Sequence, residues 1–164
     1  MTRLLVVGGA LAVLAGVFAP APVTASADGP SHDSTERRVI GLLNHVRAQQ
    51  GLGRLRASRP LARAADRHTK DMIRRNFFDH TSSDGTSFGN RLNRYTAAAQ
   101  VGENIGYLQG RANAAPRIVS MWMHSAGHRA MILEGSFRRV GVGGRQGRLG
   151  RDRVAVFTAD FASR

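Results

Sequence analysis

Trp122-Met-His-Ser-Ala-Gly-His-Arg-Ala-Met-Ile-Leu133 places a polar turn between two apolar helical pieces. On one continuous helix, His124 and His128 would share a face, as a pair of metal ligands requires. Ser125 favours a helix cap and Gly127 a helix terminus, so we expect the helix to break between the histidines. His124 is then expected at the surface or behind the site, and His128 inside it.

Two earlier segments each place one ionisable residue beside apolar neighbours. They contribute His80, in Phe-Phe-Asp-His-Thr, and Glu103, in Gly-Glu-Asn-Ile, where Gly-Glu-Asn is expected to form a tight segment. Together with His128 they form the ligand set of several catalytic zinc sites, and the same trio suits an acid–base pair with an orienting partner. Spacings of 23 and 25 residues match no short metal motif. Both interpretations therefore stay open, and only the fold can bring the three residues together.

The N-terminus has the pattern of a secretory signal: Arg3, an apolar stretch over residues 4–19, and the small residues Ala25-Ser-Ala27. The competing interpretation is a membrane anchor, but the apolar stretch is shorter than the roughly 20 residues that a spanning helix needs. We therefore expect a secreted, extracytoplasmic product. The predicted organisation is a signal peptide at residues 1–27, a linker at 28–35 and a single domain at 36–164.

The composition excludes several kinds of chemistry. The chain has no cysteine, so disulfides, thiol nucleophiles and thiolate metal sites are excluded. Its formal net charge is +13, with Lys70 as its one lysine. Such a basic surface favours anionic lipid headgroups or phosphate-bearing wall polymers, although an arginine-rich surface that is merely solvated is the alternative. The basic residues are dispersed and aromatics are few, so no specific nucleic-acid partner is expected.

Helical patterns come first along the chain. Asp33 and Glu36 predict a helix start and Gly51 its end, while Ser58 opens a second helix that carries His68 on its apolar stripe. A histidine in that setting favours a hydrogen-bonded core or cavity-wall role over a ligand role. Further helices are predicted through Arg91, Leu92 and Tyr95, and from residues 113–115 onward.

The clearest strand patterns come last. Residues 139–143 and 153–161 alternate as strands do, and the glycine-rich segment 143–150 is predicted to join them as a hairpin. Helices followed by strands, without a regular βαβ order, predict an α+β domain. There is no internal repeat.

Several segments together resemble a known family, the cysteine-poor bacterial branch of the CAP superfamily, which includes cysteine-rich secretory proteins, insect venom antigens and plant pathogenesis-related proteins. The resemblance covers about residues 36–161 and implies a three-layer α-β-α sandwich with a small antiparallel sheet. The segments that carry it are Leu43-Asn44…Arg47, Leu61…Ala64-Ala65…His68…Asp71-Met72, Phe78-Asp-His80-Thr…Asp84-Gly85, Gly102-Glu-Asn-Ile105, Trp122-Met…Ser125-x-Gly-His-Arg129…Ile132-Leu133 and Val140-Gly-Val-Gly143.

The resemblance also implies a surface cleft, and the residues predicted to line it are His80, Glu103, Ser125 and His128. Of these, His80, Glu103 and His128 are the candidates for holding a divalent metal such as zinc. Many eukaryotic relatives carry a second glutamate after the tryptophan of the third helix. This chain has Met123-His-Ser125 there, so Ser125, His124 or water would have to complete a metal shell.

Three functions follow from the resemblance. The first is a monomeric extracellular or envelope binding module, with a lipid, an anionic membrane or a cell-wall ligand as its partner. The alternative is a metal-assisted, peptidase-like hydrolase with His80 and His128 as ligands and Glu103 as ligand or general base. In the third, the His/Glu cluster only shapes the cleft. A fold alone does not choose among these functions. We rank binding first, the cluster that only shapes the cleft second and hydrolysis third.

Overall fold

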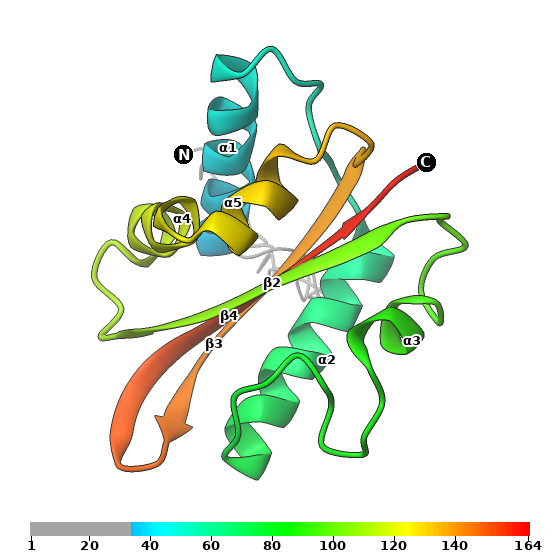
Figure 1. Cartoon of the computed structure of the whole chain (residues 1–164). Coiled ribbons are helices and arrows are strands. Elements are labelled where there is room, and N and C mark those ends of the chain that lie inside the picture. Colours follow the sequence, from blue (N-terminus) through cyan, green and yellow to red (C-terminus); the bar gives the residue numbers. More distant parts are fainter. Residues whose placement is uncertain (1–33) are drawn as a thin grey trace, which may run out of the picture.

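The computed structural model describes residues 34–164. The predicted signal peptide and all but the last two residues of the predicted linker lie outside these residues, and the first helix begins at Ser34. The elements, in order, are α1 (Ser34–Gln49), β1 (Arg56–Ala57), α2 (Arg59–Arg75), α3 (Phe88–Leu92), β2 (Val101–Gln109), α4 (Ala114–His124), α5 (Ala126–Leu133), β3 (Arg139–Leu149) and β4 (Asp152–Ala162) (Figure 1).

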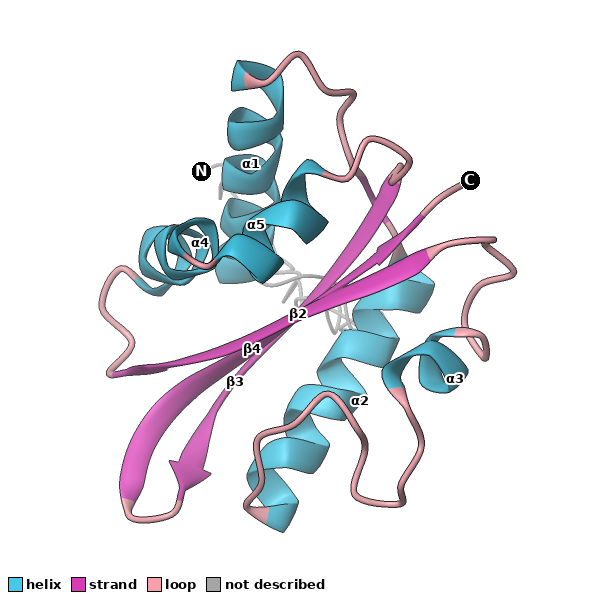
Figure 2. Cartoon of the chain, viewed as in Figure 1, coloured by secondary structure: helices cyan, strands magenta, loops and turns pink. Residues whose placement is uncertain are grey.

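One sheet lies at the centre of the molecule, with the strand order β1-β3-β4-β2. The central strand β4 pairs antiparallel with both β3 and β2, and the short β1 pairs parallel with β3. Helices α1, α4 and α5 cover one face of the sheet, and α2 and α3 cover the other (Figure 2). The predicted α+β class and its α-β-α layering are confirmed, and the sheet is mixed because of β1.

The core on the α1 side joins helix stripes to the sheet. Val39 and Leu43 of α1 pack with Trp122 of α4 and Phe161 of β4, and all four are completely buried. Trp122 donates its indole N–H to the carbonyl oxygen of Ile105 on β2, at 3.0 Å. A buried indole needs such a partner, so this bond fixes α4 against the strand that carries Glu103.

Two polar residues of the family pattern have structural roles in α1. The side chain of Asn44 donates to the carbonyl of Leu55 at 3.1 Å and accepts from its amide at 2.8 Å. The guanidinium of the completely buried Arg47 donates to the carbonyls of Ile132 and Phe137, among others. Satisfied buried donors of this kind hold loops in place, so these residues identify the fold rather than an activity.

Close contact with α2 explains the glycines of β3. A Cβ on Gly141 would lie 2.1 Å from the backbone of Leu61, and one on Gly143 would lie 2.5 Å from the amide nitrogen of Asp66. Only glycine lets the helix backbone approach this closely.

Three sequence expectations need correction. The predicted connection 143–150 is mostly strand, because β3 pairs with β4 as far as Leu149↔Asp152 and the turn falls at Gly150, whose φ is +59°. The tight segment expected around Glu103 is the extended strand β2. The helix expected through Tyr95 ends at Leu92. Gly147, in the segment predicted as a hairpin connection, lies on β3 against Ile73 of α2 and serves helix packing.

Candidate functional site

Glu103 is the centre of the polar cluster. It lies on β2 with its side chain completely buried. The Nδ1–H of His80, from the loop after α2, donates to Glu103 Oε1 at 2.8 Å, and Arg91 of α3 forms an ion pair with Oε2. Arg91 also donates to the backbone carbonyl of His80, at 3.1 Å. Three segments far apart in sequence are thus held together by one carboxylate.

These contacts set the charge of the cluster. Burial raises the pKa of Glu103, but the hydrogen bond from His80 and the charge of Arg91 outweigh it, so that the pKa lies below its ordinary value. The hydrogen bond to Glu103 raises the pKa of His80. Glu103 is therefore an ionised carboxylate whose two oxygens both have partners.

His128, near the start of α5, completes the cleft. His80, Glu103 and His128 line one cavity of about 360 Å³, and its other lining residues are Phe88, Asn104, Ser125, Gly127 and Met131. Burial lowers the pKa of His128, and the nearby charge of His80 lowers it further. The backbone carbonyl of His128 accepts a hydrogen bond from Asn104 Nδ2 at 3.0 Å, which fixes the start of α5 to β2.

The structure places the four residues predicted for the cleft, His80, Glu103, Ser125 and His128, around this cavity. The predicted break lies at Ser125, between α4 and α5, although its side chain makes no capping hydrogen bond. His124 is exposed, and its Nδ1 lies 2.7 Å from the carbonyl oxygen of Ser120.

His68 is buried on α2, as its apolar stripe predicts. Its Nε2 lies 2.9 Å from the carbonyl oxygen of Asp79, next to His80 in the chain. Burial lowers its pKa, so that the neutral imidazole is favoured. The residue thus supports the loop that carries His80.

Only part of the predicted ligand set is suited to bind a metal. Within residues 34–164, no group of three His, Cys, Asp or Glu side chains is arranged to hold a metal ion. Glu103 has both oxygens engaged, and a cation beside it would face the positive charge of Arg91. The imidazoles of His80 and His128 are the part that fits, because a carboxylate commonly orients a metal-binding histidine through its other ring nitrogen. The three-residue metal set stays a prediction.

Two ionisable residues beside Glu103 were not predicted from the sequence as part of the site. Arg91 lies on a short helix and gave no signal of its own. Asp160 is opposite Glu103 in the β2–β4 register, is completely buried, and has no hydrogen-bond partner on either carboxyl oxygen within the described part of the chain. An acid within residues 154–162, where Thr158 is the other polar residue, was a signal that could have been followed.

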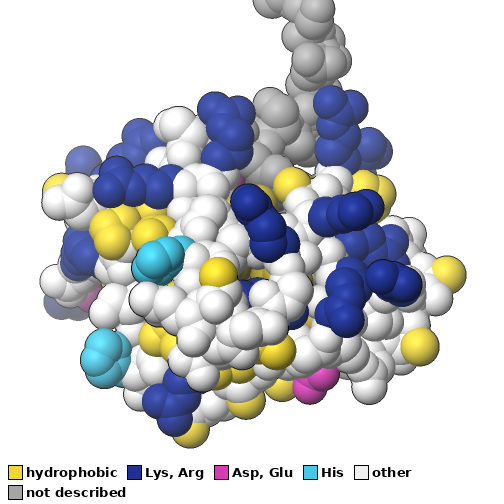
Figure 3. Space-filling view, turned by 90° about the horizontal axis from the view of Figure 1, so that it is seen from above, with side chains coloured by type: hydrophobic (Ala, Val, Ile, Leu, Met, Phe, Trp, Pro, Cys, Tyr) yellow, Lys and Arg dark blue, Asp and Glu magenta, His cyan; other side chains and the backbone are white. Residues whose placement is uncertain are grey.

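The face of the molecule seen from above carries many basic side chains (Figure 3). In the view from above, Lys and Arg side chains are spread over much of the molecule and acidic side chains are few (Figure 3). This distribution agrees with a net charge of +13 carried almost entirely by arginine.

The α-β-α sandwich and its His/Glu cleft together define a domain of the cysteine-rich secretory type. The sequence profile of the Cysteine-rich secretory protein family, CAP, matches residues 40–161. The chain belongs to this family, although it has no cysteine itself.

The relatives are bacterial proteins longer than this chain. "Uncharacterized protein YkwD" of Bacillus subtilis is 35% identical over 130 residues, which are 75% of this chain and 49% of that protein. "Uncharacterized membrane protein YlbC" of the same organism is 33% identical over 111 residues, 67% of this chain and 31% of that protein. The chain thus spans half or less of each of these two relatives.

Among solved structures, an extracellular protein containing an SCP domain from Bacillus anthracis superposes with a TM-score of 0.67 at 25% identity. The match covers 84% of this chain and 45% of that one. In this chain, no helix within residues 34–164 combines the length and apolar character needed to span a membrane.

Proposed function

We propose that this protein is an extracytoplasmic binding module that takes a lipid or wall-associated ligand in the His80–His128 cleft. The observation that carries the proposal is the state of Glu103, whose oxygens are both occupied and whose side chain is buried. A carboxylate in this state organises the cleft walls and is poorly placed to activate water. Recognition therefore suits the site better than hydrolysis.

The walls of the cleft support a ligand with an apolar body and a polar end. Phe88 and Met131 offer apolar surface, and His80, Ser125 and His128 offer hydrogen-bonding groups. Small-molecule sites combine these features and have volumes of roughly 300–1,000 Å³. With a volume of about 360 Å³, the cleft suits a small ligand or a segment of an acyl chain.

Filling the cleft tests this proposal. Gly127 lines it, and a Cβ there would meet no atom within 4 Å, so Gly127→Leu adds bulk without a clash at the backbone. Gly41 on α1 is equally open and lies outside the cleft lining, which makes Gly41→Leu the matched control. We expect saturable binding of a fluorescent fatty acid that Gly127→Leu weakens at least tenfold and Gly41→Leu leaves unchanged. Equal binding by both variants would contradict the proposal.

A metal-assisted hydrolase is the second candidate, and the carboxylate-oriented imidazole of His80 beside His128 is the observation that favours it. A bound metal would supply an activated water. His80 and His128 would hold it, and Glu103 would orient His80. This candidate predicts stoichiometric zinc in the purified protein and loss of peptide or ester hydrolysis in a folded Glu103→Gln variant. Absence of both results would exclude it.

The third candidate is a cluster that only shapes the cleft. It is consistent with the same buried contacts of Glu103. Under this candidate His80→Ala lowers the free energy of unfolding but leaves ligand binding unchanged, whereas the binding proposal predicts that both change.

A further inference from the structure

A second cavity lies at the opposite end of β2. It has a volume of about 460 Å³ and is lined by Gly110, Arg111, Gln146, Gly147, Arg148, Arg153, Val154 and Ala155. Glu103 and Gly110 are seven residues apart on an extended chain, which corresponds to roughly 20 Å. The cavity is therefore separate from the His/Glu cleft, and its chemistry is different.

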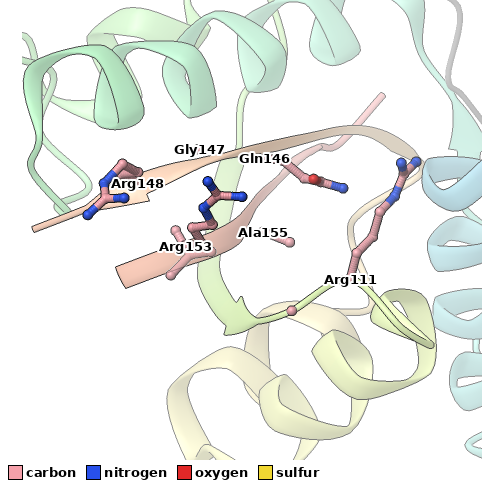
Figure 4. A pocket seen from close by; sticks show the side chains of 8 residues that line it. Arg111, Gln146, Gly147, Arg148, Arg153 and Ala155 are labelled. Carbon is pink, nitrogen blue, oxygen red and sulfur yellow. The ribbon is translucent and has the colours of Figure 1, made fainter. Parts of the chain in front are cut away.

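Three arginines come to this cavity from two parts of the chain. Figure 4 shows Arg148 and Arg153 on the β3–β4 hairpin and Arg111 on the loop before α4, with Gln146 between them along β3. None of the residues that line the cavity is acidic.

Arg148 and Arg153 occupy directly opposed positions in the β3–β4 register. Like charges at such positions destabilise a sheet. Arg148 donates from Nη2 to the carbonyl of Arg151 at 2.7 Å. The guanidinium groups of Arg111 and Arg153 form no hydrogen bond or ion pair with any residue between 34 and 164. The charge gathered here is thus not balanced by the protein groups that line the cavity, and an anion would balance it.

An adjoining cavity of about 250 Å³ extends the same surface. It shares Arg111 and Gln146 and reaches Thr35 and Ala114, which lie in the first turns of α1 and α4. The N-terminal end of a helix favours negative charge. The nearby carboxylate of Glu36 accepts a hydrogen bond from the amide of Gly144 at 2.9 Å, and Glu36 is not among the lining residues.

We propose that Arg111, Gln146, Arg148 and Arg153 form an anion-binding groove, the arginine groove, for a ligand that carries phosphate groups. A guanidinium group binds phosphate through two parallel hydrogen bonds, so several arginines around one cavity suit a phosphate ligand. Arg111 lies across the cavity from the hairpin, so a ligand with two phosphates or with a phosphodiester and a second polar group matches the spacing better than a single small anion. This site is independent of the proposed cleft ligand.

The test uses two probes that separate the sources of phosphate. Inorganic pyrophosphate, titrated by calorimetry, represents a soluble ligand, and phosphatidylglycerol vesicles with phosphatidylcholine controls represent a lipid headgroup. We expect saturable binding of at least one probe. Arg148→Gln/Arg153→Gln should weaken it tenfold or more, because the variant loses the charge-assisted hydrogen bonds that two guanidinium groups make to phosphate.

Arg54→Gln/Arg56→Gln is the matched control, because it removes the same charge from exposed arginines that line a different cavity. It should change the dissociation constant by no more than about twofold under the same conditions. Arg148→Lys/Arg153→Lys, which keeps the charge, should still weaken binding, since the paired guanidinium contacts are lost.

Unfolding by urea shows whether each variant is folded. Removal of the opposed charges at positions 148 and 153 should leave stability unchanged or increase it. Binding to neither probe, or equal weakening by the Arg54/Arg56 control, would overturn the proposal. Pyrophosphate binding without vesicle binding assigns a soluble phosphate ligand, and the reverse assigns a lipid headgroup.

Discussion

Glu103 and Asp160 lie directly opposite each other on β2 and β4, and both carboxyl side chains are buried. Glu103 has His80 and Arg91 as partners, whereas neither oxygen of Asp160 has a hydrogen-bond partner within residues 34–164. Burial raises the pKa of Asp160 well above its ordinary value, and the charge of Glu103 raises it further. These opposite shifts favour the charged form of Glu103 and the protonated form of Asp160.

Asp160→Asn tests this division of charge. In wild type, Asp160 keeps its proton in the folded state after the unfolded chain has lost it. Its contribution to stability is therefore complete below the ordinary aspartate pKa and declines as the pH rises toward the raised folded pKa. The variant lacks this loss, so its stability relative to wild type should increase from pH 4 to pH 8. Urea unfolding at both pH values measures it, and a difference that does not vary with pH would contradict the assignment.

Arg91→Leu should strongly destabilise the fold, because it leaves the buried carboxylate of Glu103 without its cationic partner. Removing one partner of a buried ion pair typically costs about 3–5 kcal/mol. Arg94 is exposed on the same segment, so Arg94→Leu is the control and should cost less than about 1 kcal/mol. The free energies of unfolding in urea provide the comparison. Similar values for the two variants would show that the Arg91–Glu103 ion pair contributes little to stability.

His80 should titrate above its ordinary pKa in the folded protein, because it donates a hydrogen bond to ionised Glu103. Glu103→Gln removes the negative charge and should lower the pKa of His80. His128 should titrate below its ordinary value, because burial disfavours its charged form. Proton NMR titration of the ring resonances measures all three effects. A His80 pKa that is unchanged by Glu103→Gln would exclude the hydrogen bond as the cause.

Gly141→Ala should disrupt the packing of α2 on the sheet, because the new Cβ would lie 2.1 Å from the helix backbone. Overpacking typically costs about 1–3 kcal/mol, and a rigid backbone contact places this variant at the upper end or beyond. Gly41→Ala meets open space on α1 and should stabilise by up to about 1 kcal/mol through helix propensity. Thermal unfolding of the two variants separates the effects, and equal midpoints would show that α2 can move away from β3.

Much of this architecture could be predicted from the sequence, for reasons visible at particular residues. The break at Ser125 was predicted from local cap and glycine preferences, although Ser125 makes no capping hydrogen bond and Gly127 lies inside α5. The burial of His68 follows from helical periodicity. The extent of β3 beyond Gly143 could not be predicted from local patterns, because Gly144 packs against Phe157 of β4 and Gly147 against Ile73 of α2, both distant in sequence.

The same limit applies to the candidate site. Residue types and the family resemblance identified His80, Glu103 and His128. They did not reveal that Arg91 occupies the second oxygen of Glu103, because this contact depends on how α3 lies against β2. That single contact shifts the balance from catalysis toward binding, and local sequence contains no signal for it.

The most direct test of the cleft as a ligand site is methionine methyl NMR during titration with a fatty acid. Met131 is the one methionine among the residues that line the cleft, and Met121 on α4 is 37% exposed outside that lining. Binding of the fatty acid in the cleft predicts a saturable shift of the Met131 methyl resonance. Gly127→Leu should abolish this shift, and the Met121 resonance should stay unchanged. A shift of Met121 without one of Met131, or no saturable shift at all, would contradict it.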